Sequence, residues 1–208
     1  SSPQPDFFYA EDARGDNPAR PGINRQNVLQ ALGLPPADFE RLAAISAAGG
    51  HAARRAEYER VGFREALGDA MDFYGTRIEK GDGVEEKRTL EPRDLERNLA
   101  AIRGAAGAAD LVVAYDHHHL WGASWEQPPG WIRELAHLCI DAGASAFVSH
   151  GVPVLQGVEI YRRRPIFYSL GNFVFHSHRR STYANPWIWK SLIATCSFDG
   201  RGDLERAE

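Results

Sequence analysis

The segment between residues 111 and 149 constrains the fold most, because it holds two short apolar runs on either side of an amphipathic helix pattern. The runs are Leu111 to Tyr115 and Ala146 to Ser149, and residues Trp131 to Ala142 place apolar side chains at helical spacing before Gly143 ends the helix. Two strands joined by such a crossover pair in parallel. The sequence therefore predicts a strand–helix–strand unit in an α/β protein with a mixed sheet.

Weaker patterns precede this unit. Residues up to Asn24 are rich in Pro, Gly, Asp and Arg and are typical of an extended loop. A helix is predicted from Pro35 to Gly49, and a second one from Ala52 to Phe73 with Tyr58 and Val61 facing inward. Residues 75–89 are predicted to form a charged loop, and a third helix is predicted to begin at Glu91-Pro92.

The C-terminal third adds strands. The runs 157–161 and 166–169 flank a turn with three arginines and predict an antiparallel hairpin, and residues 192–198 predict a last strand.

The composition excludes two classes of partner. The net charge of -4 and the pI near 6.1 give no basic field for nucleic acids or anionic membranes. No apolar run reaches the roughly 18 residues of a membrane span, so we expect no membrane segment in this chain. The compartment stays open between cytoplasm and cell surface. Cys139 and Cys196 lie in apolar segments and are interpreted as buried thiols.

Four of the eight histidines follow the two predicted parallel strands. The first strand runs into Asp116-His117-His118-His119, and the second runs into His150. Because the carboxyl ends of parallel strands meet at one sheet edge, we expect these side chains to share a cavity. Alternation along an extended segment directs His117 and His119 to one side and His118 to the other. Imidazole suits both metal binding and proton transfer.

Other readings of these residues stay open. Three adjacent histidines are also typical of a surface turn, although His150 at a second strand exit favours a site. The remaining histidines, His51, His137, His176 and His178, are interpreted as structural or exposed.

Aromatic and amide side chains near the histidines are further candidates. Trp121 and Trp125 follow the cluster and predict either an aromatic wall of a substrate pocket or ordinary core packing. Asn172 follows the hairpin and predicts either an oxyanion donor or a turn-capping amide.

Residues 111–175 resemble the CapA-type family of poly-γ-glutamate capsule-synthesis proteins. The resemblance is carried by Asp110-Leu111-Val112-Val113, by Cys139 to Ala144, and above all by the stretch from Val154 to Phe173 that contains Tyr168-Ser169-Leu170-Gly171-Asn172. A weaker match at Arg20-Pro21-Gly22-Ile23-Asn24 adds Arg20 and Asn24 as substrate-binding candidates.

The resemblance implies a metallophosphatase-like sandwich with a mixed β-sheet flanked by helices. In that family an early Gly-Asp strand and an Asn-His motif supply ligands, and neither occurs in this sequence. Residues 1–208 are therefore expected to be the C-terminal part of one domain, with a loop and helical insertion over 1–90 and an α/β core over 91–208. The expected partners are a small-molecule or polymer substrate and the missing N-terminal segment.

One position departs from the family pattern. The family carries two histidines at the second strand exit, whereas this sequence reads Ser149-His150-Gly151-Val152-Pro153, and proline offers no ligand atom. Either a divalent Mn, Zn or Fe ion is held by His117, His119 and His150, with His119 or His118 compensating, or the site works without a cofactor.

Three functions follow from this alternative. The first is a metal-dependent hydrolase of the metallophosphatase type, in which His117, His119, His150 and Asn172 are the catalytic candidates. The second is a metal-independent lyase or dehydratase in which the same histidines act as acid and base. The third is a non-catalytic scaffold for capsule assembly.

Overall fold

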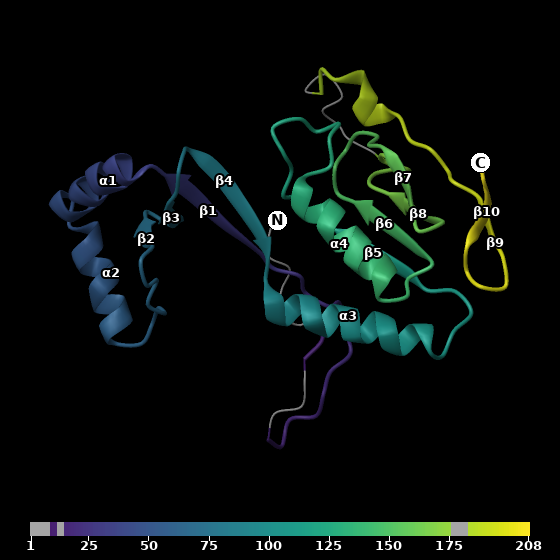
Figure 1. Ribbon diagram of the computed structural model, residues 1–208, viewed down its shortest axis with the longest axis horizontal. Helices are drawn as coiled ribbons and strands as arrows, with labels where there is room; N and C mark the ends of the chain where they lie inside the picture. Colours follow the sequence, from purple (N-terminus) through teal and green to yellow (C-terminus); the bar gives the residue numbers. More distant parts are fainter. Residues whose placement is uncertain (1–8, 12–14, 176–182) are drawn as a thin grey trace. The chain divides into compact units, whose positions relative to one another are not determined.

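The computed structural model describes residues 9–11, 15–175 and 183–208, and it divides the chain into two compact units. One unit comprises residues 27–91, and the other combines residues 1–26 with residues 92–208 (Figure 1). Part of the predicted N-terminal loop, together with His176 and His178, lies outside the described residues. Within the described ranges no helix is long and apolar enough to cross a membrane.

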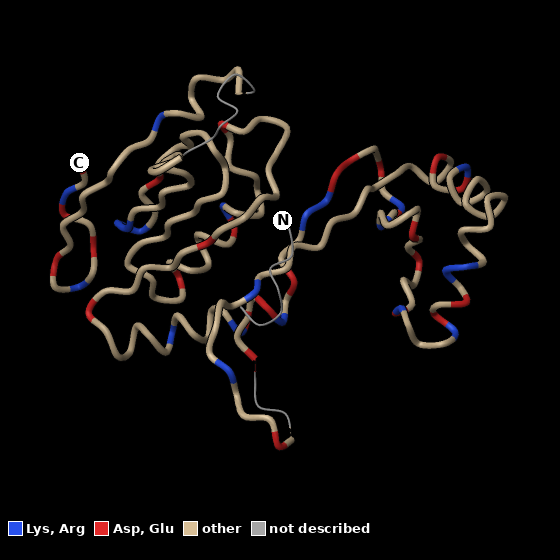
Figure 2. Tube along the Cα trace, turned by 180° about the vertical axis from the view of Figure 1, so that it is seen from behind, with Lys and Arg blue, Asp and Glu red and all other residues tan. Residues whose placement is uncertain are grey.

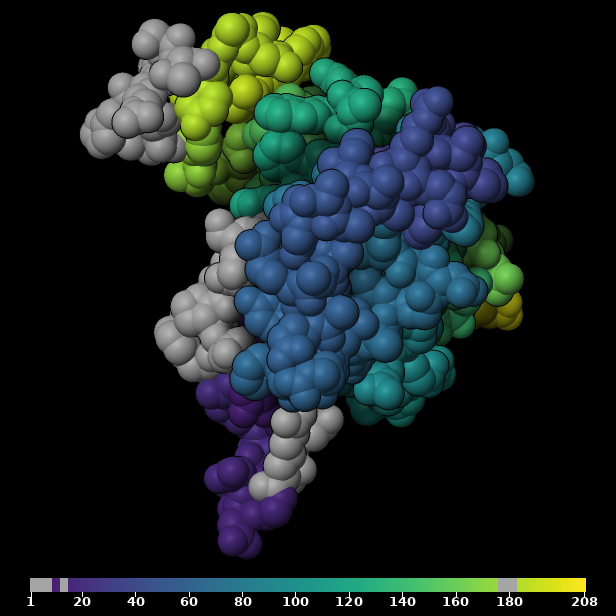
Figure 3. Space-filling view, turned by 90° about the vertical axis from the view of Figure 1, so that its left-hand side faces the viewer, coloured from purple at the N-terminus to yellow at the C-terminus, as the bar shows by residue number. Residues whose placement is uncertain are grey.

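The unit of residues 27–91 is a four-stranded sheet with two helices. Its elements are β1 (Val28–Leu34), α1 (Pro36–Ala48), α2 (His51–Arg60), β2 (Met71–Phe73), β3 (Thr76–Lys80) and β4 (Glu85–Leu90), and the strand order is β2-β3-β1-β4. Leu34, Phe39 and Ile78 form its buried core. Figure 3 shows the surface of this unit, with α1 and α2 in blue.

The predictions for this unit were wrong after the first helix. The second helix ends at Arg60 instead of Phe73, the charged loop forms β3 and β4, and Tyr58 and Val61 are 49% and 45% exposed. Gly62 and Gly68 adopt positive φ angles of 79° and 62° after α2, which ends the helical pattern. The strands were missed because β3 and β4 each bury a single apolar residue and otherwise consist of charged residues and one threonine.

The second unit contains the predicted strand–helix–strand segment. Its helices are α3 (Pro92–Ala106) and α4 (Gly130–Asp141), and its strands are β5 (Val113–His117), β6 (Ala146–His150), β7 (Val158–Tyr161) and β8 (Arg164–Phe167), in the order β5-β6-β8-β7. β5 pairs in parallel with β6, β6 in parallel with β8, and β7 with β8 in the predicted antiparallel hairpin. The predicted α/β class with a mixed sheet is confirmed.

The C-terminal residues leave this sheet. A 3-10 turn, η3 (Pro186–Trp189), precedes a separate hairpin of β9 (Cys196–Phe198) and β10 (Leu204–Ala207). The last predicted strand is therefore shorter than 192–198, because its first residues instead bond to the loop after β8 through Leu192 N–H and the Leu170 carbonyl at 2.9 Å.

Helix α4 packs its apolar side on the sheet. Six of its twelve residues are buried: Trp131, Ile132, Leu135, Ala136, Cys139 and Ile140. Phe147 of β6 and Ile166 of β8 are buried as well. Along the described residues of both units, acidic and basic residues are interspersed (Figure 2), and the net charge of the chain is -4.

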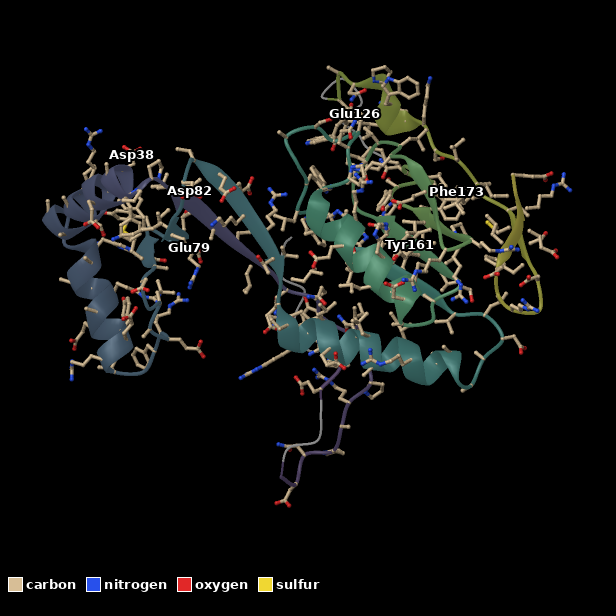
Figure 4. All side chains as sticks on the ribbon, viewed as in Figure 1. Asp38, Glu79, Asp82, Glu126, Tyr161 and Phe173 are labelled. Atoms are coloured by element: carbon tan, nitrogen blue, oxygen red, sulfur yellow. The ribbon has the colours of Figure 1, made fainter. Side chains whose placement is uncertain are left out.

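A polar cluster joins α4 to β7. His137 Nε2 lies 2.7 Å from Glu159 Oε1, and the Tyr168 hydroxyl donates a hydrogen bond to Glu159 Oε2 at 2.6 Å. The His137 ring also stacks on Tyr161, with ring centroids 4.0 Å apart. Tyr161 is labelled in Figure 4. The hydrogen bond from Tyr168 is the main cause that lowers the pKa of Glu159, and the bond from His137 acts in the same direction.

We expect Glu159→Gln to destabilise the protein near neutral pH by about 1 kcal/mol, because the variant loses the charge that strengthens both hydrogen bonds. The pKa of Glu159 is lowered on folding, so its stabilisation is present above the unfolded value of about 4.3 and is lost as the pH falls through the folded value. Thermal unfolding at pH 7 and pH 3 measures this. Glu134→Gln, at an exposed position of helix α4, is the control. An equal difference from wild type at both pH values would contradict the assignment.

Candidate functional site

The parallel pairing of β5 with β6 brings two predicted site residues together. His117 and His150 are the last residues of these strands and are direct partners in the register. Their Nδ1 atoms lie 3.4 Å apart, and their ring centroids lie 5.3 Å apart. Two histidines separated by 33 positions in sequence thus share one edge of the sheet.

His119 joins this pair from the same side. Its Nε2 atom lies 3.2 Å from Nε2 of His117, and the ring centroids are 5.1 Å apart. The three rings form a row in which His117 stands between its two neighbours. We call His117, His119 and His150 the histidine row.

His118 points to the opposite side of the strand, as alternation predicted. Its ring is 7% exposed and packs edge-on against Trp131 of α4, with centroids 4.7 Å apart. Asp116 Oδ2 lies 2.7 Å from His118 Nδ1, and the Ser149 hydroxyl lies 3.3 Å from the same nitrogen. His118 is therefore anchored in the core and holds the residues on either side of it in place.

The backbone at the strand exits reinforces this anchor. The His118 N–H donates to the His150 carbonyl at 3.0 Å, so the β5–β6 pairing continues past the last strand residues. Gly151 follows with φ of 115°, and a Cβ atom there would lie 1.9 Å from the His118 carbonyl oxygen. Only glycine allows this close approach. Sequence reasoning missed Asp116, Ser149 and Gly151, although the spacing of Asp116 and His118 places both on one face of the strand.

The electrostatic setting of His117 favours its neutral imidazole form. Burial is the largest cause that lowers the pKa of His117, and the neighbouring His150 and His119 lower it further, while Asp116 opposes them. His117 is therefore an uncharged proton acceptor near neutral pH.

The row does not fit a single metal ion. Two nitrogens bound to one tetrahedral zinc lie about 3.3 Å apart, given Zn–N bonds of about 2.0–2.1 Å, and both pairs in the row match this spacing. However, His117 faces His119 with Nε2 and His150 with Nδ1, and these nitrogens point away from each other on one ring. Across the described part of the chain, no three His, Cys, Asp or Glu side chains are arranged to hold a metal.

The tryptophans lie beside the row, and the structure shows their packing contacts. Trp121 packs on the buried cluster of Val152, Val154 and Ile188, and its ring centroid lies 5.8 Å from that of His119. Trp125 stacks edge-on against Trp121 at 4.7 Å and is 38% exposed. Trp121 therefore connects the row to the core, and Trp125 extends an aromatic surface towards solvent.

The remaining candidates lie in other settings. The Asn172 amide donates to the carbonyl of Pro153 at 3.4 Å and to that of Ile188 at 3.1 Å, so it ties the loop after β6 to η3. Arg20 pairs with Glu11 at 3.0 Å in the N-terminal segment, and Asn24 is exposed there. Asn172 thus makes hydrogen bonds that join two segments of the chain, and Arg20 makes an ion pair within the N-terminal segment.

Several known proteins are similar in sequence to this chain. An uncharacterized protein of Sinorhizobium fredii, y4sH, is 34% identical over 176 residues, which cover 85% of this chain and 36% of the relative. The PGA biosynthesis protein CapA of Bacillus subtilis is 34% identical over 121 residues, which cover 56% of this chain and 31% of the relative. The capsule biosynthesis protein CapA of Bacillus anthracis is 47% identical over 70 residues, which cover 33% of this chain and 16% of the relative.

The chain thus spans about a third of the length of the first of these relatives. The family model described as bacterial capsule synthesis protein PGA_cap matches residues 39–177, a range that contains the whole histidine row. The chain therefore belongs to the PGA_cap family of bacterial capsule synthesis proteins.

Proposed function

We propose that this protein is a hydrolase that cleaves an acidic polymer in capsule biosynthesis, and that the histidine row supplies its general base and general acid. The observation that carries the proposal is the position of His117 between His119 and His150, with nitrogens 3.2 and 3.4 Å away, at the exits of two parallel strands. The substrate class comes from the relatives, of which one is named for PGA biosynthesis and another for capsule biosynthesis.

The row can carry out both proton transfers of an amide hydrolysis. An outer ring of the row, His119 or His150, accepts a proton from water as the water oxygen attacks the carbonyl carbon, because both ring nitrogens of His117 face its neighbours. The carbon–nitrogen bond then breaks, and the leaving amine takes its proton from an imidazolium of the row. Because His117 lies within hydrogen-bond distance of both neighbours, a proton taken at one ring is available at the next. Trp125 and Trp121 border the space where the polymer would lie.

A lyase is the second candidate, and Pro153 favours it. The position where the family carries a second histidine has no donor atom here, so the donors of the row are imidazoles alone. The same base could remove a proton from carbon while a second imidazole protonates the departing amide nitrogen as its bond to the neighbouring carbon breaks, with no water consumed.

Oligo-γ-glutamate incubated in ¹⁸O-labelled water with the full-length protein tests the proposal. We expect shorter oligomers that carry one ¹⁸O at each new carboxyl end, with a rate unchanged after dialysis against EDTA. Cleavage without ¹⁸O would identify the lyase. Activity lost in EDTA and restored by manganese or zinc would replace the imidazole mechanism with a metal-dependent one. No cleavage at all would leave the scaffold function of a capsule-assembly protein.

A further inference from the structure

Helix α2 carries a polar stripe at the spacing where a packed helix usually carries apolar residues. Four side chains at positions i, i+3, i+4 and i+7 share this side of the helix: His51, Arg54, Arg55 and Tyr58. Helix α2, which the structure describes in full, has no buried residue, although β2 lies beside it (Figure 1). A helix that contributes to a core places hydrophobic side chains at this spacing. Core packing therefore does not explain the stripe.

The stripe lines a cavity of about 360 Å³. The other walls are Arg64 in the segment after α2, Asp72 of β2 and Gly75 in the turn between β2 and β3. Small-molecule sites have volumes of about 300–1,000 Å³, so the cavity is large enough for part of a ligand chain. All of its lining residues belong to the unit of residues 27–91, and none belongs to the histidine row.

A histidine and an aspartate fix one wall of the cavity. His51 Nε2 lies 2.6 Å from Asp72 Oδ1, which joins the start of α2 to β2. The Gly75 N–H donates to the same carboxylate oxygen at 3.2 Å. The His51 ring also stacks on Tyr74, with ring centroids 4.3 Å apart. These contacts hold the helix against the turn between β2 and β3.

The segment after α2 is fixed by hydrogen bonds to the helix. The N–H groups of Phe63 and Arg64 donate to the Tyr58 carbonyl at 2.9 and 3.2 Å. Arg55 Nη2 donates to the Glu65 carbonyl at 2.6 Å. The backbone of Arg64 is thereby held beside the stripe, while its side chain is exposed.

Two guanidinium groups of the cavity lack an acidic partner. Arg55 is paired with Glu59 at 2.8 Å. Arg54 and Arg64, in contrast, form no ion pair with any residue that the structure describes. The planar guanidinium group binds carboxylates and phosphates through two parallel hydrogen bonds. The cavity is therefore suited to a ligand with more than one negative group.

Asp72 narrows the class of this ligand. Its Oδ1 faces His51 and Gly75, whereas its Oδ2 receives no hydrogen bond from the described residues. A compact anion such as phosphate would be repelled by this carboxylate. A chain that carries carboxylates and amide N–H groups can place its anions at the arginines and an N–H at Asp72 Oδ2. The combination favours an acidic polyamide over a free phosphate.

We propose that this cavity is a second binding site for an acidic polyamide, in which Arg54 and Arg64 bind carboxylates and Asp72 accepts an amide N–H. The choice of oligo-γ-glutamate as the probe rests on the proposed function, whereas the preference for a carboxylate chain depends on the cavity alone.

Hydrogen–deuterium exchange of the full-length protein with oligo-γ-glutamate tests the site. The His117→Asn background keeps the oligomer intact during the measurement. We expect peptides that cover residues 51–64 to exchange at least twofold more slowly when the oligomer is present, and peptides of α1 to exchange at an unchanged rate. Inorganic phosphate at the same concentration should slow neither. Equal protection by phosphate would show a general anion site and overturn the assignment to a carboxylate chain.

Calorimetric titration of the same background measures the contribution of each arginine. We expect Arg54→Gln and Arg64→Gln each to raise the Kd about fivefold, as the loss of an exposed ion pair does. Arg41→Gln removes the same charge from α1, where its side chain is 81% exposed, and should leave the Kd within twofold. An equal rise in all three variants, or a rise in none, would overturn the site.

Neither readout requires turnover, so this inference and the proposed hydrolysis fail separately. Cleavage of the oligomer by the wild-type protein without protection of residues 51–64 would refute the cavity and leave the histidine row. Protection without cleavage would support the cavity and refute the hydrolase.

Discussion

Replacing His117 by asparagine will lower the rate of polymer cleavage by about a hundredfold to ten-thousandfold, which is the usual contribution of a general acid or base. The loss is expected because His117 alone faces both other members of the histidine row. Asparagine keeps a polar group of similar size but accepts no proton near neutral pH. Initial rates on oligo-γ-glutamate, measured with the full-length protein, check the prediction.

His137→Asn is the matched control for this variant. It likewise removes an imidazole, but the His137 ring lies on α4, is half-buried and bonds to Glu159 away from the row. We expect its rate to remain within threefold of wild type. If His117→Asn also remains within threefold of wild type while it stays folded, the row has no role in proton transfer.

Replacing Gly151 by alanine will lower the free energy of unfolding by about 3 kcal/mol. The new Cβ would lie 1.9 Å from the carbonyl oxygen and 2.8 Å from the carbonyl carbon of His118, and both are backbone atoms that cannot rotate away. The φ of 115° adds strain for any side chain. Relief of the clash requires the exits of β5 and β6 to separate, which would break the hydrogen bond from His118 N–H to the His150 carbonyl.

Denaturant unfolding followed by circular dichroism measures this change. Gly157→Ala is the control, because its Cβ would meet no atom within 4 Å and its φ is not positive. We expect Gly157→Ala to unfold within about 0.5 kcal/mol of wild type, as surface substitutions usually do. Equal midpoints for the two variants would show that the approach of Gly151 to His118 does not constrain the strand exits.

Local sequence patterns were sufficient to predict the parallel strand pair that carries the histidines. The apolar runs before His117 and His150 and the helix that ends at Gly143 are contiguous, and a right-handed crossover leaves one way to pair them. The two-residue period of a strand then separated His117 and His119 from His118. The crossover rule and the strand period together predicted that His117 and His150 would lie close together, without knowledge of distant contacts.

The first unit could not be derived in this way. Strands β3 and β4 present charged side chains at most positions, with pairs such as Arg77 and Glu79 at 2.7 Å, so their sequence has no alternation of apolar residues. They become strands because β1 lies between them and supplies their hydrogen bonds. Propensity is overridden where pairing partners come from other parts of the chain.

Tertiary contacts also determined the burial and the hydrogen-bond partners of the side chains near the site. His118 is a core residue because Asp116, Ser149 and Trp131, which come from three different segments, surround its ring. The amide of Asn172 donates to two carbonyl groups, one in the loop after β6 and one in η3. Sequence spacing shows which residues share a face of one strand, but burial and hydrogen bonding depend on atoms brought together only when the strands and helices pack.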